Sequence, residues 1–165
     1  MEANFYITHL NLQRHPEGGY FKETYRAAES FPADGLPNRF NGDRSFSTAI
    51  YYLLQQGDFS AFHRIKSDEC WHFYAGETLL IHMIEKTGKY LCVKLGANLD
   101  RGETFQFVVP AAAWFASEPS PNAAFALAGC TVAPGFDFND FEMANKQTLL
   151  SDFPQHTHII SRLCR

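Results

Sequence analysis

The sequence predicts a single all-β domain, folded as a sandwich or jelly-roll barrel, with short helices at its two ends. Short runs rich in β-branched and aromatic residues recur along the chain, and turns containing Gly, Pro, Asp or Asn separate them. Helical patterns occur only near the termini. The 165 residues fall within the usual size of one domain. No internal repeat or low-complexity linker divides the chain.

The expected elements follow one another in a simple order. A helical pattern starts at Asn4 (NFYITHLNL) and another at Asn139 (NDFEMANKQTLLSDF). Between them lie the strand-like runs GGYFKETYR, SFSTAIYYLL, FSAFHRI, CWHFYAG, ETLLIHMIEK, KYLCVKLG, ETFQFVVP, AAWFAS and AAFALAGCTVAP. We therefore expect one domain over residues 1–165, with an amino-terminal helix or arm (1–17), a β-barrel (18–134) and a carboxy-terminal helical cap (135–165).

Composition excludes several classes of partner. The 14 Lys and Arg are outnumbered by 18 Asp and Glu, and no stretch gathers several basic residues, so we expect no nucleic-acid partner. The longest apolar runs are shorter than the ~20 residues of a spanning helix, and MEANFYITH lacks the features of a secretion signal. The four cysteines form no CxxC pair, as is typical of reduced thiols. The sequence thus predicts a cytoplasmic protein without a membrane partner.

One predicted hairpin, FSAFHRIKSDECWHFYAG, carries most of the candidate chemistry. Because side chains alternate along a strand, His63 and Ile65 share one face. A polar turn at 66–68 would reverse the chain, after which Glu69 and Trp71 share a face. A tight hairpin in register would place His63 and Glu69 diagonally on the same side of one sheet. The carboxylate could then orient or charge the imidazole.

Glycines frame this hairpin in the pattern Gly57-x5-His63-x-Ile65-x3-Glu69-x6-Gly76. The pattern resembles the first signature of the cupin superfamily, in which a His-x-His pair, a Glu and a later His converge on a metal inside a small β-barrel. Here Ile65 stands in the place of the second His. The resemblance implies a cupin-type double-stranded β-helix, which is a jelly-roll barrel.

The second cupin signature is matched more loosely. Pro110 takes the place of its proline, Ala112 that of its glycine and Phe115 that of its histidine. Of the four usual ligands only His63 and Glu69 are present, whereas a catalytic metal typically needs three protein ligands and an open position. We therefore expect no metal and no other cofactor. A metal-dependent cupin enzyme is the weaker alternative.

Four further blocks extend the resemblance over nearly the whole chain: HPEGGYFKETYR, RSFSTAIYYLL, FHRIKSDECWHFYAGE and VAPGFDFNDFE. They resemble one largely uncharacterised cupin family, often described as predicted sugar epimerases. This resemblance implies a homodimer in which amino-terminal strands cross to the partner's sheet. Family members are compared with RmlC-type deoxysugar epimerases, which are metal-free and use a His base and a Tyr acid. Carried over to this chain, the base is His63.

These residues lead to a hypothesis of proton abstraction and return on a keto-sugar. His63 would act as the base, Glu69 as its orienter and one tyrosine as the acid. Tyr51, Tyr52 and Tyr74 lie on candidate barrel strands, and alternation directs either Tyr51 or Tyr52 inward. Tyr51 is the assignment we carry forward.

Other side chains are candidates for the pocket wall. The aromatic residues are core by default, and each could also contact a ligand, as could an amide among apolar neighbours. The candidates for ligand binding are Trp71, Phe73, Gln106, Trp114 and Phe115. The expected ligand is a small molecule, such as a sugar or a nucleotide-sugar. The alternative to an isomerase or epimerase is a cupin that binds a small ligand without catalysis, because fold alone cannot separate these functions.

Overall fold

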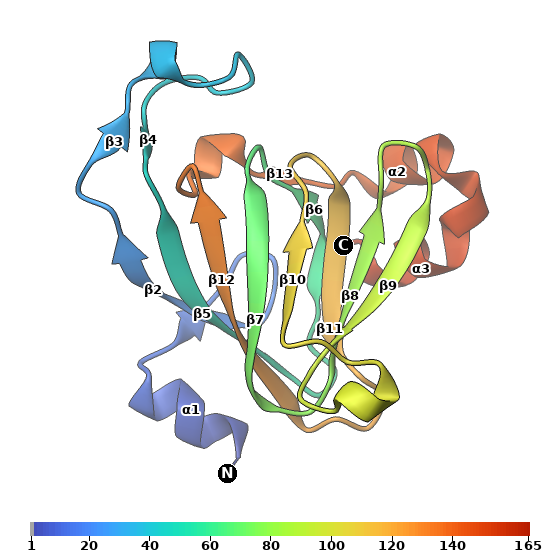
Figure 1. Ribbon diagram of the computed structural model, residues 1–165. Coiled ribbons are helices and arrows are strands. Elements are labelled where there is room, and N and C mark those ends of the chain that lie inside the picture. Colours follow the sequence, from blue (N-terminus) through green and yellow to red (C-terminus); the bar gives the residue numbers. More distant parts are fainter. Residues whose placement is uncertain (1) are drawn as a thin grey trace.

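Two antiparallel sheets face each other across the core in the computed structural model, which describes residues 2–165 (Figure 1). The six-stranded sheet has the order β1 (Gln13–Arg14), β2 (Tyr20–Arg26), β5 (Thr48–Gln55), β12 (Phe125–Ala133), β7 (Asp68–Gly76) and β10 (Gln106–Val109). The five-stranded sheet has the order β13 (Glu142–Met143), β6 (Ser60–Arg64), β11 (Trp114–Pro119), β8 (Leu79–Ile84) and β9 (Tyr90–Leu95). The predicted all-β jelly roll is confirmed.

Short elements complete the chain. Strands β3 (Ser30–Phe31) and β4 (Arg44–Ser45) form a hairpin that projects beyond the barrel (Figure 1). The helices are α1 (Ala3–His9), α2 (Lys146–Asp152) and α3 (Thr157–Leu163), and the 3-10 turns are η1 (Ala33–Gly35), η2 (Leu99–Arg101), η3 (Phe138–Asp140) and η4 (Pro154–His156). Within residues 2–165, every helix is too short or too polar to cross a membrane.

The prediction that His63 and Glu69 lie on the two strands of one tight hairpin is wrong. Strand β6 pairs with β11 and β13 in one sheet, whereas β7 pairs with β12 and β10 in the other. The turn after β6 therefore carries the chain from one sheet to the opposite sheet. His63 and Glu69 therefore lie on opposite sheets, and each points across the barrel interior toward the other sheet. Strand alternation is the same in both arrangements, so the sequence pattern could not distinguish them.

The barrel is filled at one end and hollow at the other. On β12, Ala126 and Ala128 belong to the core, while Cys130 and Val132 reach a pocket. On β5, Tyr52 is buried in the same core and Ile50 lines the pocket. Small side chains on β12 leave room for large aromatic neighbours at the filled end, as close packing requires. The hollow end is where polar side chains from several strands converge.

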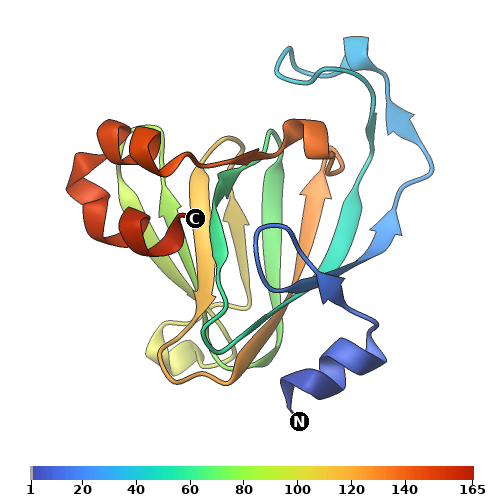
Figure 2. The same cartoon turned by 180° about the vertical axis from the view of Figure 1, so that it is seen from behind.

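Helices cover parts of the outer faces. A buried cluster that includes Phe62, Ile84, Leu149 and Ile160 joins α2 and α3 to the five-stranded sheet, and Figure 2 shows both helices on that side. Helix α2 starts later than the pattern from Asn139 suggested, since residues 138–143 form η3 and β13. The Asn145 side chain caps α2 by accepting a hydrogen bond from the Thr148 N–H at 3.0 Å.

Candidate functional site

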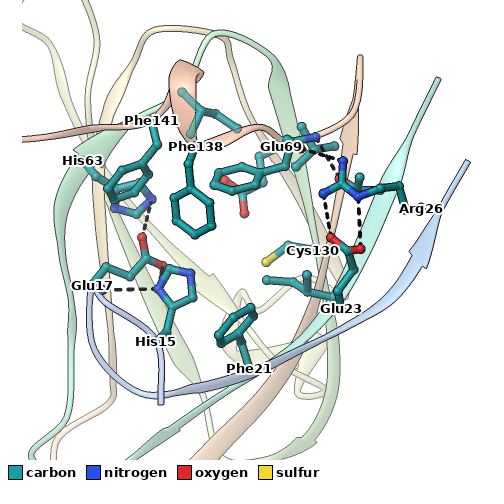
Figure 3. A pocket seen from close by; sticks show the side chains of 15 residues that line it. His15, Glu17, Phe21, Glu23, Arg26, His63, Glu69, Cys130, Phe138 and Phe141 are labelled. Carbon is teal, nitrogen blue, oxygen red and sulfur yellow. Dashed lines mark hydrogen bonds and ion pairs between the residues drawn. The ribbon is translucent and has the colours of Figure 1, made fainter. Parts of the chain in front are cut away.

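A pocket at the hollow end of the barrel encloses about 610 Å³ of empty space, including its open mouth (Figure 3). The amino-terminal arm, both sheets and the segment after β12 all contribute to its wall. The polar lining residues include His15, Glu17, Glu23, Arg26, His63 and Glu69, and the apolar ones include Phe21, Ile50, Ile65, Phe136, Phe138 and Phe141. A concave, mostly apolar pocket with a few convergent polar groups is typical of a small-molecule site.

His63 and Glu17 form a buried pair in the pocket wall. His63 Nε2 lies 3.2 Å from Glu17 Oε2, and both side chains are less than 10% exposed. His63 Nδ1 lies 2.7 Å from the carbonyl oxygen of Ala61. Because a carbonyl oxygen only accepts, Nδ1 carries a proton. Nε2 then lies within ion-pair distance of the Glu17 carboxylate.

His15 lies on the other side of Glu17. The main-chain N–H of Glu17 donates to His15 Nδ1 at 3.2 Å, and Glu17 Oε1 is 3.6 Å from the same nitrogen. Burial lowers the pKa of His15, and the charge of Glu17 opposes this only in part. His15 is therefore neutral near pH 7. Since Nδ1 accepts a hydrogen bond, the proton of this ring is on Nε2.

Glu69 reaches the pocket from the opposite sheet and is 8% exposed. Burial, followed by the negative charge of Glu17, raises the pKa of Glu69 to about 8. A hydrogen bond with the Cys130 thiol acts in the other direction and is the smaller effect. Near pH 7 this carboxyl therefore carries a proton and can donate a hydrogen bond into the pocket.

Three phenyl rings on the segment after β12 cover part of the mouth. Phe136 and Phe138 have ring centroids 5.1 Å apart, and the Phe141 ring lies 5.3 Å from that of His63. The Phe136 N–H donates to Thr48 Oγ1 at 2.9 Å, which ties the segment to β5. Arg26 donates to the Phe136 carbonyl oxygen at 3.1 Å.

Arg26 also donates to Glu23 from its other two nitrogens. Its Nη2 and Nε atoms bond the two carboxylate oxygens at 2.7 and 3.1 Å. This bidentate pair lies at the edge of the pocket, with both side chains 43% exposed. The guanidinium is thus occupied by protein acceptors.

The positions of the predicted catalytic residues differ from the expectation in two respects. His63 and Glu69 both line the pocket, but the carboxylate paired with His63 is Glu17. Tyr51 lies on the outer face of the six-stranded sheet, where its ring is 5.8 Å from that of Tyr74. Tyr52 faces inward, is buried below the pocket and donates to the Gly18 carbonyl oxygen at 2.6 Å.

The predicted ligand-binding residues do not appear in the wall of this pocket. Trp71, Phe73 and Phe115 belong to the core or pack against it, because they point into the filled end of the barrel. Trp114 faces outward beneath Arg64, whose guanidinium carbon is 4.3 Å from the ring centroid. Gln106 is exposed on the outer face and bonds His72 at 2.9 Å.

The residues that sequence reasoning missed come from the arm and from the segment after β12. His15 and Glu17 lie in HPEGG, a segment whose Pro and Gly residues are typical of a turn. The signal was a charged residue beside two glycines: Gly18 and Gly19 have φ of 118° and 72°. A Cβ at Gly18 would lie 2.1 Å from the carbonyl oxygen of Phe59. The turn thus needs glycine, and it delivers Glu17 into the barrel.

Comparison with known proteins places this geometry in a family. Residues 4–144 match the family described as "Cupin superfamily (DUF985)". The chain belongs to the cupin superfamily. A hypothetical protein from Leishmania major has 34% identity and a TM-score of 0.89, with 99% of each chain covered. Protein SO0799 from Shewanella oneidensis has 38% identity and the same TM-score, covering 100% of this chain and 98% of that one.

A relative from yeast extends the comparison without assigning an activity. The uncharacterized protein YML079W of Saccharomyces cerevisiae is 33% identical over 152 residues, covering 81% of this chain and 71% of the yeast protein. The cupin resemblance is thus confirmed. The narrower resemblance to RmlC-type epimerases stays a prediction.

The donor set of this cupin does not fit a metal. Ile65 and Phe115 are buried hydrocarbon side chains at the positions where the cupin signatures have histidines. Across residues 2–165, no three or more His, Cys, Asp or Glu side chains are arranged to hold an ion. The polar side chains of the pocket are instead either protonated or paired with one another.

Proposed function

We propose that this cupin catalyses proton transfer on a small, uncharged carbonyl compound and so isomerises or epimerises it. The single observation that supports this is the coexistence in one pocket of the close Glu17–His63 pair and of Glu69, whose raised pKa keeps it protonated near pH 7. Pairs of titratable groups with opposite protonation states are the usual signature of acid–base catalysis.

The Glu17–His63 pair is the proposed base. Both nitrogens of His63 already face acceptors, Ala61 O and Glu17 Oε2. The oxygen left to receive a proton from the substrate carbon is therefore Glu17 Oε1. His63 holds this carboxylate in place, so the two residues act as one unit. This arrangement modifies the simpler hypothesis in which His63 alone removes the proton.

Glu69 is the proposed acid. It reaches the pocket from the opposite sheet and, near neutral pH, it can donate a proton to the carbonyl oxygen of the substrate. Donation there stabilises the enol that forms when the base removes the neighbouring proton. Return of that proton to the adjacent carbon moves the carbonyl group, whereas delivery of a solvent proton to the other face of the same carbon inverts it.

The charge of the pocket favours an unphosphorylated substrate. The carboxylates of Glu17 and Glu23 line it, and Arg26 is its one Lys or Arg side chain among the described residues. Because Glu23 neutralises Arg26 and each of its three nitrogens already donates to a protein acceptor, the pocket has no uncompensated guanidinium for a phosphate group. A free keto-sugar therefore suits the pocket better than a nucleotide-sugar.

Hydrogen–deuterium exchange tests this proposal. The purified protein would be incubated in D2O with unphosphorylated ketoses and with dihydroxyacetone, and loss of the C–H signal next to the carbonyl followed by NMR. We expect exchange with at least one compound, and a decrease of about 100-fold to 10,000-fold in Glu17→Gln, His63→Asn and Glu69→Gln. His158→Asn, at an exposed position on α3, is the matched control. Undiminished exchange in Glu17→Gln and His63→Asn would refute the assignment.

A non-catalytic binding protein is the second candidate. It is favoured by the phenyl rings of Phe21, Phe136, Phe138 and Phe141, which give the pocket an apolar wall suited to retaining a ligand. Compounds that bind in calorimetry yet show no exchange would support this function over catalysis.

A further inference from the structure

A second group of titratable side chains lies away from the pocket, on the outer face of the five-stranded sheet. His82 of β8 and Cys92 of β9 are direct cross-strand partners. Directly opposed residues on antiparallel strands have Cβ atoms about 4.5–5.5 Å apart, so the imidazole and the thiol are neighbours. Leu91 and Val93 pack against the barrel core, so alternation turns Cys92 outward, where it is exposed.

His82 is held between two further side chains. Its Nε2 lies 3.1 Å from Glu118 Oε1 on β11, and its Nδ1 lies 2.7 Å from the Tyr90 hydroxyl on β9. Arg162 of α3 bonds the other oxygen of Glu118. Since an ionised carboxylate only accepts, Nε2 carries a proton; in the charged ring Nδ1 also donates, to the Tyr90 oxygen. The Tyr90 proton is then free to point at the thiol.

This arrangement favours negative charge on Cys92. The neighbouring His82 lowers the pKa of Cys92 by more than burial raises it; Tyr90 adds to the lowering, and the negative charge of Glu118 opposes it. Burial lowers the pKa of His82, but Cys92 and Glu118 together raise it by a larger amount. Burial opposes ionisation of Glu118, yet bonds from His82 and Arg162 hold its pKa at about 2. Lys94 lies on the same face of β9, two residues along.

The other three cysteines lack these features. Cys70 is half-buried, and Cys130 and Cys164 are buried. Burial raises the pKa of all three thiols. Access also favours Cys92, because it is the exposed thiol among the four.

We propose that Cys92 is a reactive thiol that forms a mixed disulfide with low-molecular-weight disulfides, with His82 and Tyr90 as its activating partners. The Cys92 thiolate attacks one sulfur of the incoming disulfide, a new S–S bond forms, and the original S–S bond breaks. Cys92 is oxidised, the departing sulfur is reduced, and the released thiolate takes a proton from solvent. This site is independent of the barrel pocket.

Site-resolved labelling tests the proposal. Native protein would be treated with 5,5′-dithiobis(2-nitrobenzoate) and, separately, with glutathione disulfide over a range of pH, and the modified cysteine identified by peptide mass spectrometry. We expect Cys92 to react roughly tenfold or more faster than Cys70 at pH 7. In His82→Asn and Tyr90→Phe the reaction should move to higher pH, while Cys70→Ser should leave the Cys92 profile unchanged.

Two variants keep the experiment decisive if one of them unfolds. Circular dichroism would establish that each variant retains its strands, and Tyr90→Phe removes only a hydroxyl. Reaction of Cys92 at the rate of Cys70, or an unchanged pH profile in a folded His82→Asn or Tyr90→Phe, would overturn the proposal. Modification by the aromatic reagent without modification by glutathione disulfide would show an exposed thiol and reject exchange with biological disulfides.

Discussion

Glu69 shows how a single buried carboxyl affects both stability and chemistry. An ordinary Glu ionises near pH 4.5, whereas burial raises the pKa of Glu69 to about 8. Between these values the folded chain holds a proton that the unfolded chain has lost. The free energy of unfolding therefore decreases as pH rises through this window, by at most ~1.4 kcal/mol per pH unit, and levels off above pH 8.

Replacing Glu69 by Gln should reveal this effect. We expect the melting temperature of Glu69→Gln to exceed that of the unsubstituted protein at pH 8, with the difference shrinking toward pH 5, because Gln keeps the shape and has no proton to lose. Differential scanning calorimetry over pH 5–8 measures it. Glu29→Gln, at an exposed position, should leave the profile unchanged. A constant difference at all pH values would mean that Glu69 is ionised in the folded state.

Single residues also show where sequence reasoning stops. His63 and Glu69 could be predicted to reach the barrel interior, because alternation along each strand is a local property. To choose between Tyr51 and Tyr52, one must know which of the two faces inward on β5, and two adjacent tyrosines do not indicate this. The role of Glu17 was missed, because its approach to His63 depends on the path of the arm across the barrel.

At the scale of elements, an ion pair anchors the segment that covers the pocket. Arg44 of β4 bonds both oxygens of Asp140 in η3, at 2.6 and 2.7 Å, and both side chains are about 4% exposed or less. Lys66 approaches the same carboxylate at 3.4 Å. This pair joins the projecting β3–β4 hairpin to the turn that carries Phe138. This contact between Arg44 and Asp140 could not be predicted, since the two residues lie far apart in the sequence.

Breaking this pair should loosen the segment. Asp140→Asn would leave the Arg44 guanidinium buried without its counter-charge, at a cost of about 3–5 kcal/mol in the free energy of unfolding. Urea titration measures the loss, and hydrogen exchange of residues 134–143 should become faster. Glu142→Gln breaks the exposed pair with Arg64 and should cost less than about 1 kcal/mol. Equal costs in the two variants would contradict the anchoring role.

At the scale of the whole molecule, the fold class was predictable while the connection between strands was not. Residue types and turn spacing are sufficient to indicate an all-β barrel. The sheet to which each strand belongs depends on pairings between distant segments, as the separation of β6 from β7 shows.

The homodimer expected from the family resemblance stays a prediction, and the outer face of the six-stranded sheet offers a surface for it. Tyr25, Tyr74 and Val108 are each 46–55% exposed there.

Sedimentation velocity would test the dimer. We expect the unsubstituted protein to sediment as a dimer and Tyr74→Glu to shift the equilibrium toward monomer, because a charge would be buried in an apolar interface. His158→Glu, on α3 beside the other sheet, should leave the equilibrium unchanged. A monomer at all concentrations of the unsubstituted protein would exclude this assembly.

The pocket takes Glu17 from the arm, His63 and Glu69 from the middle of the chain, and the phenyl rings from the segment after β12. During synthesis on the ribosome, the arm emerges first, and Glu17 cannot reach its partners on β6 until that strand has been translated. The ring that packs against His63 is still missing at that stage, because Phe141 leaves the exit tunnel later. A nascent chain therefore carries no working cavity until most of its length has been made, so prematurely terminated products should be inert toward any ligand of the finished protein.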